Sequence, residues 1–213
     1  MIKPLKFTLI FILALTAVAT VFFGSEAQAE IRPLVEGTDY QVMGPKGSAK
    51  PEVIEFFSYA CGHCYTMEGF VNQFKSNNAS IKFTAVPTDL GHPQWSIYVK
   101  AYYLGQLLKV LDKSHGKIFH RINVQKKPIT SDAGLKSFFV ELGVTPKQYD
   151  SASKSFALDA KLRRAKQLLR KYQVNSTPTF VANQRFRLDN RELKSNEMIE
   201  KALLDLTGAA GQK

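Results

Sequence analysis

The stretch Val53-Ile54-Glu55-Phe56-Phe57-Ser58-Tyr59-Ala60-Cys61-Gly62-His63-Cys64 decides the fold of this chain. Its first five residues form a near-continuous apolar run, which is the pattern of a central strand covered on both faces. A short joint leads to the two cysteines, and residues 64–74 carry apolar side chains at helical spacing. Because residues 80–87 indicate another strand, this part of the chain predicts a strand–helix–strand unit with a right-handed parallel crossover.

The segments that flank this unit predict a sheet interrupted by helices. Residues 37–43 indicate a first short strand. Residues 93–158 carry no strand signal and show helical apolar spacing instead, beginning with one helix face over residues 97–111. Strands are indicated again at 179–182 and 185–188, and a last helix follows Ser195 as its N-cap. The sequence therefore predicts one α/β sheet domain with a helical insertion.

Local signals predict where helices end inside this insertion. Ser131 is typical of a helix N-cap and Gly143 of a helix stop. Thr145-Pro146 opens another helix. Three residues of that helix are expected to face the core: Tyr149, Ala152 and Phe156. A further helix is predicted over residues 161–173, and Asn183-Gln184 is predicted to be a two-residue hairpin connection.

The N-terminus has the features of a cleavable signal peptide. Lys3 and Lys6 precede an uncharged apolar run over residues 7–23, and Ala27-Gln28-Ala29 supplies small residues at the positions that a signal peptidase reads. We therefore expect cleavage before Glu30 and export of the remaining 184 residues. A retained membrane anchor is the alternative, because a 17-residue apolar run is about the minimum that spans a bilayer.

The charge and the cysteine content narrow the possible functions. The formal net charge is +11, and about +10 remains without the leader. The basic residues are scattered, except for two groups, at 161–164 and 170–171, on the helix predicted over residues 161–173. No nucleic-acid motif accompanies them, so we predict no nucleic-acid binding. The two cysteines lie within four residues, and a disulfide that closes so short a loop removes little unfolded-chain entropy. The pair therefore serves reactivity or a metal.

The order strand, cysteine, helix predicts a reactive Cys61. Its sulfur would face unpaired backbone N–H groups and the positive end of the helix dipole, and both favour thiolate over thiol. His63 would add a second group that stabilises the anion. Cys64 lies on the same helical face, about 5–6 Å away between Cα atoms, which a disulfide tolerates. We predict that Cys61 is the exposed nucleophile and that Cys64 is the shielded thiol that resolves the mixed disulfide.

A zinc site is the alternative use of this motif. Zinc usually takes four ligands from two pairs, and the motif supplies one cluster. The other histidines show no pairing that would supply the second: His92, His115 and His120. We therefore predict no metal, and no cofactor beyond the redox-active pair Cys61–Cys64.

Two other positions are candidates for the same site. Thr177-Pro178-Thr179 opens the later strand, where proline is either punctuation after a helix or a cis proline beside the cysteines that helps to bind an extended peptide. Glu55 stands inside an apolar strand. If it is buried, its pKa rises and it can exchange protons with Cys64; the alternative is a solvated carboxylate at a strand margin.

Together these residues resemble the DsbA family of bacterial periplasmic oxidases. The likeness follows the chain in order, through segment 55–65, a helical insertion, and Thr177-Pro178 before residues 180–183. The resemblance implies a thioredoxin-like fold with an inserted helical domain. The implied division is a signal peptide at 1–29, a thioredoxin-like domain in two parts at 30–92 and 161–213, and the inserted domain at 93–160.

The resemblance also implies a role for each matching residue. Cys61 would be the nucleophile, Cys64 the resolving cysteine and His63 the group that stabilises the thiolate. Pro178 would be the cis proline and Glu55 the buried acid. The substrate would contact four residues beside the cysteines: Gly62, His63, Thr177 and Pro178.

The family implies partners and a location as well. The substrates would be reduced, unfolded exported proteins, and a DsbB-like membrane protein would reoxidise the enzyme, which would be a periplasmic monomer that meets the membrane only through that partner. The family commonly has Pro-His between the cysteines, whereas Gly62-His63 and Thr177 resemble disulfide isomerases. An isomerase or reductase of the same superfamily is therefore the nearest alternative, and a peptide-binding holdase is an alternative of another class.

Overall fold

A computed structural model describes residues 32–189 and 191–209 of the chain. The predicted signal peptide and its cleavage site lie outside these residues. Within the described ranges, no helix is both long enough and apolar enough to cross a membrane.

A five-stranded mixed sheet forms the centre of the fold, with the strand order β1-β5-β4-β2-β3. The strands are β1 Tyr40–Val42, β2 Glu52–Phe57, β3 Lys82–Pro87, β4 Thr179–Ala182 and β5 Phe186–Leu188. Strand β2 pairs in parallel with β3, while the pairs β2–β4, β4–β5 and β1–β5 are antiparallel. The parallel pair is the predicted crossover unit, and it is confirmed.

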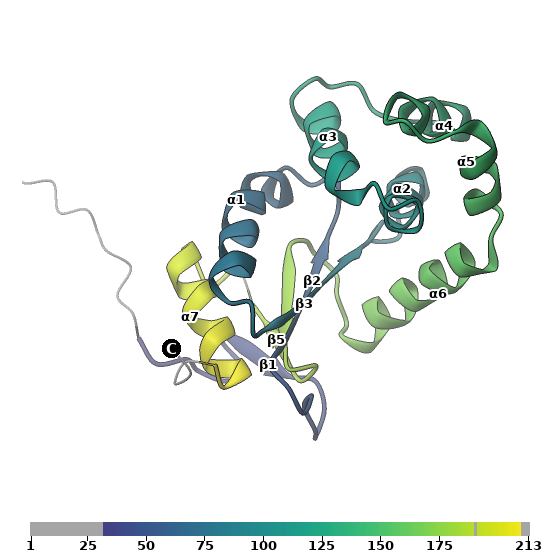
Figure 1. Cartoon of the computed structure of the whole chain (residues 1–213). Coiled ribbons are helices and arrows are strands. Elements are labelled where there is room, and N and C mark those ends of the chain that lie inside the picture. The colour runs from purple at the N-terminus through teal and green to yellow at the C-terminus, as the bar shows by residue number, and fades with distance from the viewer. Residues whose placement is uncertain (1–31, 190, 210–213) are drawn as a thin grey trace, which may run out of the picture. The chain divides into compact units, whose positions relative to one another are not determined.

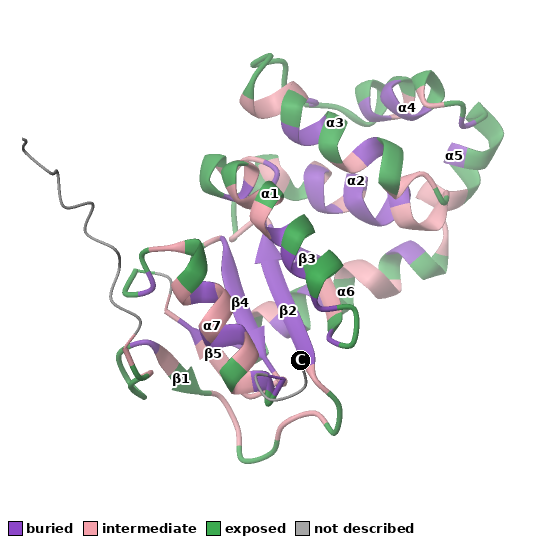
Figure 2. Cartoon of the chain, turned by 60° about the vertical axis from the view of Figure 1, so that its left-hand side comes forward, coloured by how far each residue is buried: buried purple, intermediate pink, exposed green. Residues whose placement is uncertain are grey.

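Strand β2 is buried along its whole length, as its apolar run predicts. Its side chains alternate between the two faces of the sheet. Val53 packs in a cluster with residues of helices α1 (Gly62–Asn77) and α7 (Asn196–Thr207), whereas Ile54 and Phe56 pack in the cluster that covers the opposite face. Figure 1 shows α1 and α7 on one side of the sheet, and Figure 2 shows β2 and β4 as buried strands.

Five helices and a short 3₁₀ turn at Pro93–Trp95 stand between β3 and β4, which confirms the predicted helical insertion. The helices are α2 Ser96–Leu107, α3 Leu111–Asn123, α4 Asp132–Glu141, α5 Pro146–Ser153 and α6 Phe156–Lys171. Side-chain oxygens of Ser131, Thr145 and Ser195 cap α4, α5 and α7 as predicted, because each accepts a hydrogen bond from a free backbone N–H in the first turn.

The helix predicted over residues 97–111 is in fact two helices. Helix α2 ends at Leu107, Lys109 adopts a positive φ of 57°, and Leu111 already belongs to α3. The start of α3 is hard to predict from the sequence for two reasons. Val110, at the N-cap position, offers no capping side chain, and the buried face of α3 includes the polar Ser114. A side chain at Gly105 of α2 would come within 2.7 Å of the Ser114 hydroxyl, so the absence of a Cβ permits this close helix contact.

The prediction that Phe156 faces the core is wrong. Ser155 caps a new helix by accepting from the Leu158 N–H, so α6 begins at Phe156 rather than near residue 161. The Phe156 side chain is 78% exposed. The predicted domain boundary after residue 160 falls inside α6, and the division of the chain into domains stays a prediction.

Two strand boundaries also differ from the predictions. Strand β1 is limited to Tyr40–Val42. The hairpin connection has three residues, 183–185, because Ala182 pairs with Phe186. Asn183 and Gln184 take positive φ angles of 49° and 55°, and the Arg185 N–H donates to the Ala182 carbonyl at 3.0 Å. The turn thus uses left-handed backbone at both predicted positions but adds one residue.

Two phenylalanines test this description of the core. Phe119 is fully buried and packs edge-to-face with Tyr59, with ring centroids 4.7 Å apart, whereas Phe156 is exposed. Phe119→Ala should lower the free energy of unfolding by about 3–5 kcal/mol, since it leaves a cavity. Phe156→Ala should change it by less than about 0.5 kcal/mol. Urea denaturation of both variants measures the difference, and equal losses would contradict the assignment of Phe156 to the surface.

Candidate active site

Cys61 is the N-cap residue of helix α1. Its backbone is extended (φ −93°, ψ 115°), as expected where strand and joint give way to helix, and its sulfur accepts a hydrogen bond from the Cys64 N–H at 3.4 Å. Partial positive charge at a helix N-terminus favours an anion. Because β2 is fixed in the sheet and α1 packs on it, the backbone holds this sulfur at the helix end.

The pKa of the Cys61 thiol is lowered to about 5. The largest cause is a hydrogen bond with the Cys64 side chain, and further hydrogen bonds with Thr177 and with the backbone N–H groups of Cys64 and His63 act in the same direction. Partial burial opposes the shift but does not outweigh it. Cys61 is therefore a thiolate at neutral pH, and thiolate is the nucleophilic form of cysteine.

Cys64 has the opposite character. Both cysteines are free thiols in this structure, but Cys64 is 1% exposed, whereas Cys61 is only partly buried. Burial raises the pKa of Cys64 well above its ordinary value, and the hydrogen bond to Cys61 and the negative charge of Cys61 raise it further. The pair thus combines an accessible thiolate with a shielded thiol, which is the arrangement that the sequence predicts.

The segment before β4 lies against the reactive sulfur. The Thr177–Pro178 peptide bond is cis. Strand register places Thr179 opposite Phe56, near the end of β2 that leads to the cysteines, and the Thr177 carbonyl oxygen lies 3.3 Å from the Cys61 sulfur. The structure therefore brings Thr177 and Pro178 to Cys61 across more than a hundred residues of chain.

Gly62 and His63 occupy the first turn of α1 and are both exposed. A side chain at Gly62 would meet nothing within 4 Å, so this position leaves open space beside the sulfur. His63 contributes its backbone N–H to the lowered pKa of Cys61. Its predicted role as a stabilising imidazole stays a prediction.

Glu55 is buried, which decides between the two interpretations of this residue. The side chain is 2% exposed, and its Oε1 has no hydrogen-bond partner among the described residues. Loss of hydration raises its pKa to about 8; the charge of Glu68 adds to this shift and Lys75 opposes it. The carboxyl therefore holds its proton near neutral pH, as a group that donates or accepts protons there must be able to do.

Glu55 faces a cavity of about 360 Å³ between the sheet, α1 and the insertion. Glu68 and Lys75 of α1 line it together with Tyr102 of α2 and His115 of α3. A proton can reach the buried carboxyl through such a space if water enters it. Across the described ranges, no group of three or more His, Cys, Asp or Glu residues is arranged to hold a metal ion.

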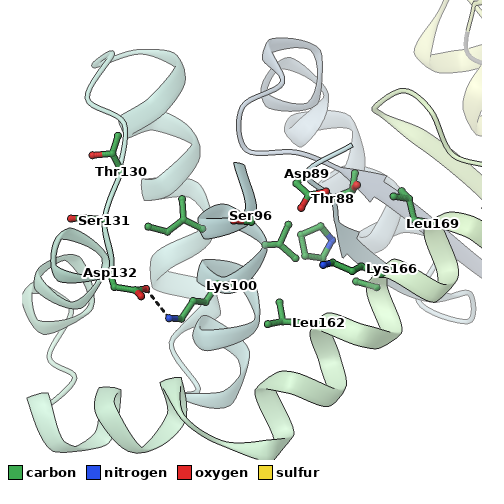
Figure 3. Close-up of a pocket in the computed structure, with 14 residues that line it drawn as sticks. Thr88, Asp89, Ser96, Lys100, Thr130, Ser131, Asp132, Leu162, Lys166 and Leu169 are labelled. Atoms are coloured by element: carbon green, nitrogen blue, oxygen red, sulfur yellow. Dashed lines mark hydrogen bonds and ion pairs between the residues drawn. The ribbon is translucent and has the colours of Figure 1, made fainter. Parts of the chain in front are cut away.

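A second cavity, of about 400 Å³, lies beyond the end of β3 between α2, α4 and α6 (Figure 3). Its wall combines apolar residues such as Leu162 and Leu169 with a rim that carries the Lys100–Asp132 ion pair (2.7 Å). The two cysteines are not part of its lining.

Comparisons with known proteins fit this geometry. The model of the DSBA-like thioredoxin domain family matches residues 97–203. The thiol:disulfide interchange protein DsbA of Pseudomonas syringae pv. tomato is 30% identical over 183 residues, which are 84% of this chain and 85% of that protein. The chain belongs to the DsbA family. The DsbA protein of Pseudomonas aeruginosa is 28% identical over 83% of this chain and 84% of its own.

Solved structures of DsbA proteins share the fold. A crystal structure of a single-residue variant of Pseudomonas aeruginosa DsbA aligns with a TM-score of 0.77 and 25% identity, over 85% of this chain and all of that one. DsbA from Xylella fastidiosa aligns with a TM-score of 0.74 over 85% of this chain and 99% of that one, at 24% identity. The expected thioredoxin-like fold with a helical insertion is thereby confirmed, and the chain is a disulfide oxidoreductase of the DsbA family.

The structure adds residues that the sequence interpretation missed. Tyr59, in the joint before Cys61, is fully buried, and its hydroxyl lies 2.7 Å from Nδ1 of His115. Asn123 of α3 donates to the Tyr59 carbonyl at 3.0 Å. The one sequence signal for this contact is that Tyr59 is a polar aromatic residue within an apolar segment. Nothing in the neighbouring sequence indicates that its partners are on α3.

The buried Glu55 generates a pH-dependent prediction. Because its pKa in the folded protein, about 8, lies above the ordinary value of 4.5, its contribution to stability is present below pH 4.5 and is lost as the pH rises to 8. Glu55→Gln has no such loss. Its free energy of unfolding should therefore exceed that of the natural protein by an amount that grows between pH 4.5 and 8 and then levels off.

Denaturation across this pH range measures the difference. The control is Glu141→Gln, which alters an exposed carboxylate on α4 and should change the free energy of unfolding by less than about 0.5 kcal/mol. A difference for Glu55→Gln that does not change with pH would contradict the buried, protonated carboxyl.

Proposed function

We propose that this protein introduces disulfide bonds into exported proteins by dithiol–disulfide exchange through Cys61-Gly62-His63-Cys64. The observation that carries the proposal is the asymmetry of the pair. One sulfur is an accessible thiolate whose pKa is about 5, and the other is a buried thiol. In such a pair, the accessible sulfur forms the mixed disulfide with the client, and the buried sulfur is the one that can resolve it.

The reaction begins with the oxidised enzyme, in which Cys61 and Cys64 are bonded. A client thiolate attacks the Cys61 sulfur, so the client–Cys61 bond forms, the Cys61–Cys64 bond breaks, and its electron pair leaves on Cys64. The Cys64 thiolate takes up a proton, which its raised pKa favours. A second client thiolate then attacks the client sulfur of the mixed disulfide, which releases Cys61 as a thiolate and the client as a disulfide. The client loses two electrons and the enzyme gains them.

The stability of the Cys61 thiolate drives this direction. Every interaction that lowers the pKa of Cys61 stabilises the reduced enzyme, and these interactions are weaker when the sulfur is bonded to Cys64, because a disulfide sulfur carries no negative charge. The oxidised pair therefore accepts electrons readily. We further propose that Glu55 exchanges protons in the Cys64 step, and its pKa of about 8, which lets it change protonation near neutral pH, supports this role.

The substrate-binding residues are proposed to be Gly62, His63, Thr177 and Pro178. The first two are exposed beside the sulfur, and the Thr177 carbonyl lies against it. A related solved structure supports this proposal: a cysteine-to-serine variant of Proteus mirabilis DsbA, with a TM-score of 0.70 and 25% identity, holds a non-covalently bound peptide PWATCDS. A peptide that contains cysteine is the kind of substrate that an unfolded client presents.

The cellular setting is part of the proposal. The N-terminal sequence supports export through a signal peptide cleaved before Glu30, and hence a periplasmic location. The clients would be reduced, unfolded exported proteins, and a DsbB-like membrane protein would take the electrons from Cys61 and Cys64. The enzyme needs no cofactor besides this pair.

Gly62 and Thr177 favour an isomerase or reductase as the second candidate function, since both residues resemble those of disulfide isomerases at the matching positions. Equilibration with glutathione separates the two activities. A reduction potential near that of thioredoxin, about −270 mV, would favour a reductase. A holdase, in contrast, would keep its activity when both cysteines are replaced by serine.

Single cysteine variants test the order of the reaction. Cys64→Ser leaves the nucleophile without its resolving thiol, so an activated cysteine peptide should accumulate as a stable mixed disulfide with Cys61. Cys61→Ser retains only the buried thiol and should form at least about 10-fold less adduct in the same time. Mass spectrometry of the intact protein measures both. Equal trapping by the two variants would contradict the assigned roles.

A further inference from the structure

Two polar contacts of one histidine of the insertion link the two sides of the cysteine motif. The Tyr59 hydroxyl lies 2.7 Å from Nδ1 of His115, and Nε2 of His115 lies 3.2 Å from Oε2 of Glu68. Tyr59 stands two residues before Cys61, and Glu68 stands four residues after Cys64 on the same face of α1. His115 comes from α3, which is far away in the sequence.

One arrangement of protons satisfies all three groups. Burial raises the pKa of Tyr59 well above its ordinary value, so the hydroxyl keeps its proton and can donate it to Nδ1. Nδ1 then accepts, and Nε2 carries the hydrogen on the side that faces the Glu68 carboxylate, 3.2 Å away. This pattern, a carboxylate that orients an imidazole and an imidazole that orients a hydroxyl, fixes the ring and both of its partners.

The surroundings of His115 are rigid. Its ring packs edge-on against three aromatic rings in the core between β2, α2 and α3: Phe57, Tyr102 and Phe119. The side chains of His115 and Glu68 are only 24% and 18% exposed, and that of Tyr59 is fully buried. Well-packed groups with few alternative conformations hold their partners closely.

Helix α3 reaches the same joint at a second point. Asn123, at the end of α3, donates to the Tyr59 carbonyl at 3.0 Å while it also bonds its own helix at Phe119. The hydroxyl and the carbonyl of Tyr59 are therefore both anchored to α3. The joint that delivers Cys61 to the N-terminus of α1 is held by the insertion rather than by the sheet alone.

We propose that His115 is a positioning residue of the redox centre. Through Tyr59 and Glu68 it holds the joint before Cys61 and helix α1 in one fixed relation, and so sets how readily the bonded cysteine pair accepts electrons. The inference rests on the proposed function, and it gives the helical insertion a part in the chemistry. Without this link, the Cys61 sulfur leaves the N-cap position more often and its thiolate loses hydrogen bonds.

The test compares variants in their equilibrium with glutathione. Tyr59→Phe removes one hydroxyl and keeps the ring, and His115→Phe keeps an aromatic ring but loses the polar contacts with both Tyr59 and Glu68. Each should lower the equilibrium constant for oxidation of glutathione by the protein by roughly 3-fold or more, a common size for coupled groups. The double variant should fall no further than the single ones, because both break the same link. His120→Phe, at an exposed site on α3, is the matched control and should change nothing.

Each outcome decides the inference. Unchanged constants in the single variants, or a double variant whose loss is the product of the single losses, would overturn it. If His115→Phe does not fold, the comparison of Tyr59→Phe with His120→Phe decides alone, since Tyr59→Phe alters one atom of the core. Glutathione equilibrium needs no protein client, so a failure of this inference is distinguishable from a failure to oxidise clients.

Discussion

The chemistry of this protein depends on the position of one sulfur atom at the N-terminus of one helix. Cys61 caps α1 and accepts a hydrogen bond from the Cys64 N–H at 3.4 Å, and the Cys64 thiol and Thr177 also interact with it. Together these interactions keep the sulfur as an anion at neutral pH. A disulfide that includes this sulfur carries no negative charge to be stabilised in this way, and this difference between the two redox states is the source of the proposed oxidising tendency.

The rest of the fold holds that sulfur in place. Strand β2 is buried on both faces, so its end is fixed, and β4 pairs beside it in a register that brings Thr177 to the sulfur. The arrangement carries a cost in stability at Glu55, whose carboxyl is buried without a complete set of hydrogen bonds. The carboxyl lies beside a cavity that Glu68, Lys75 and His115 also line, which is consistent with proton exchange.

The sequence predicted the central elements because their signals are local. The apolar run before Cys61, the capping residues Ser131 and Ser195, and the proline at 178 each act through neighbouring residues. The error at Phe156 is local, because Ser155 starts a new helix there. Helix α3 was not separated from α2 because Val110 offers no capping side chain and because the buried side of α3 includes the polar Ser114. Distant contacts decide the place of His115, which lies against Tyr59. The cis state of the Thr177–Pro178 bond and the contacts of His115 could not be read from spacing at all.

The most direct measurement is a titration of the reduced protein by its thiolate absorbance, with Cys61→Ser as the blank. Since the pKa of Cys64 is raised well above its ordinary value, Cys61 alone should ionise in the accessible range. The account predicts a midpoint near pH 5. A midpoint near 8.5, the ordinary value for cysteine, would show that the helix end does not hold the anion, and the proposed oxidising mechanism would be wrong.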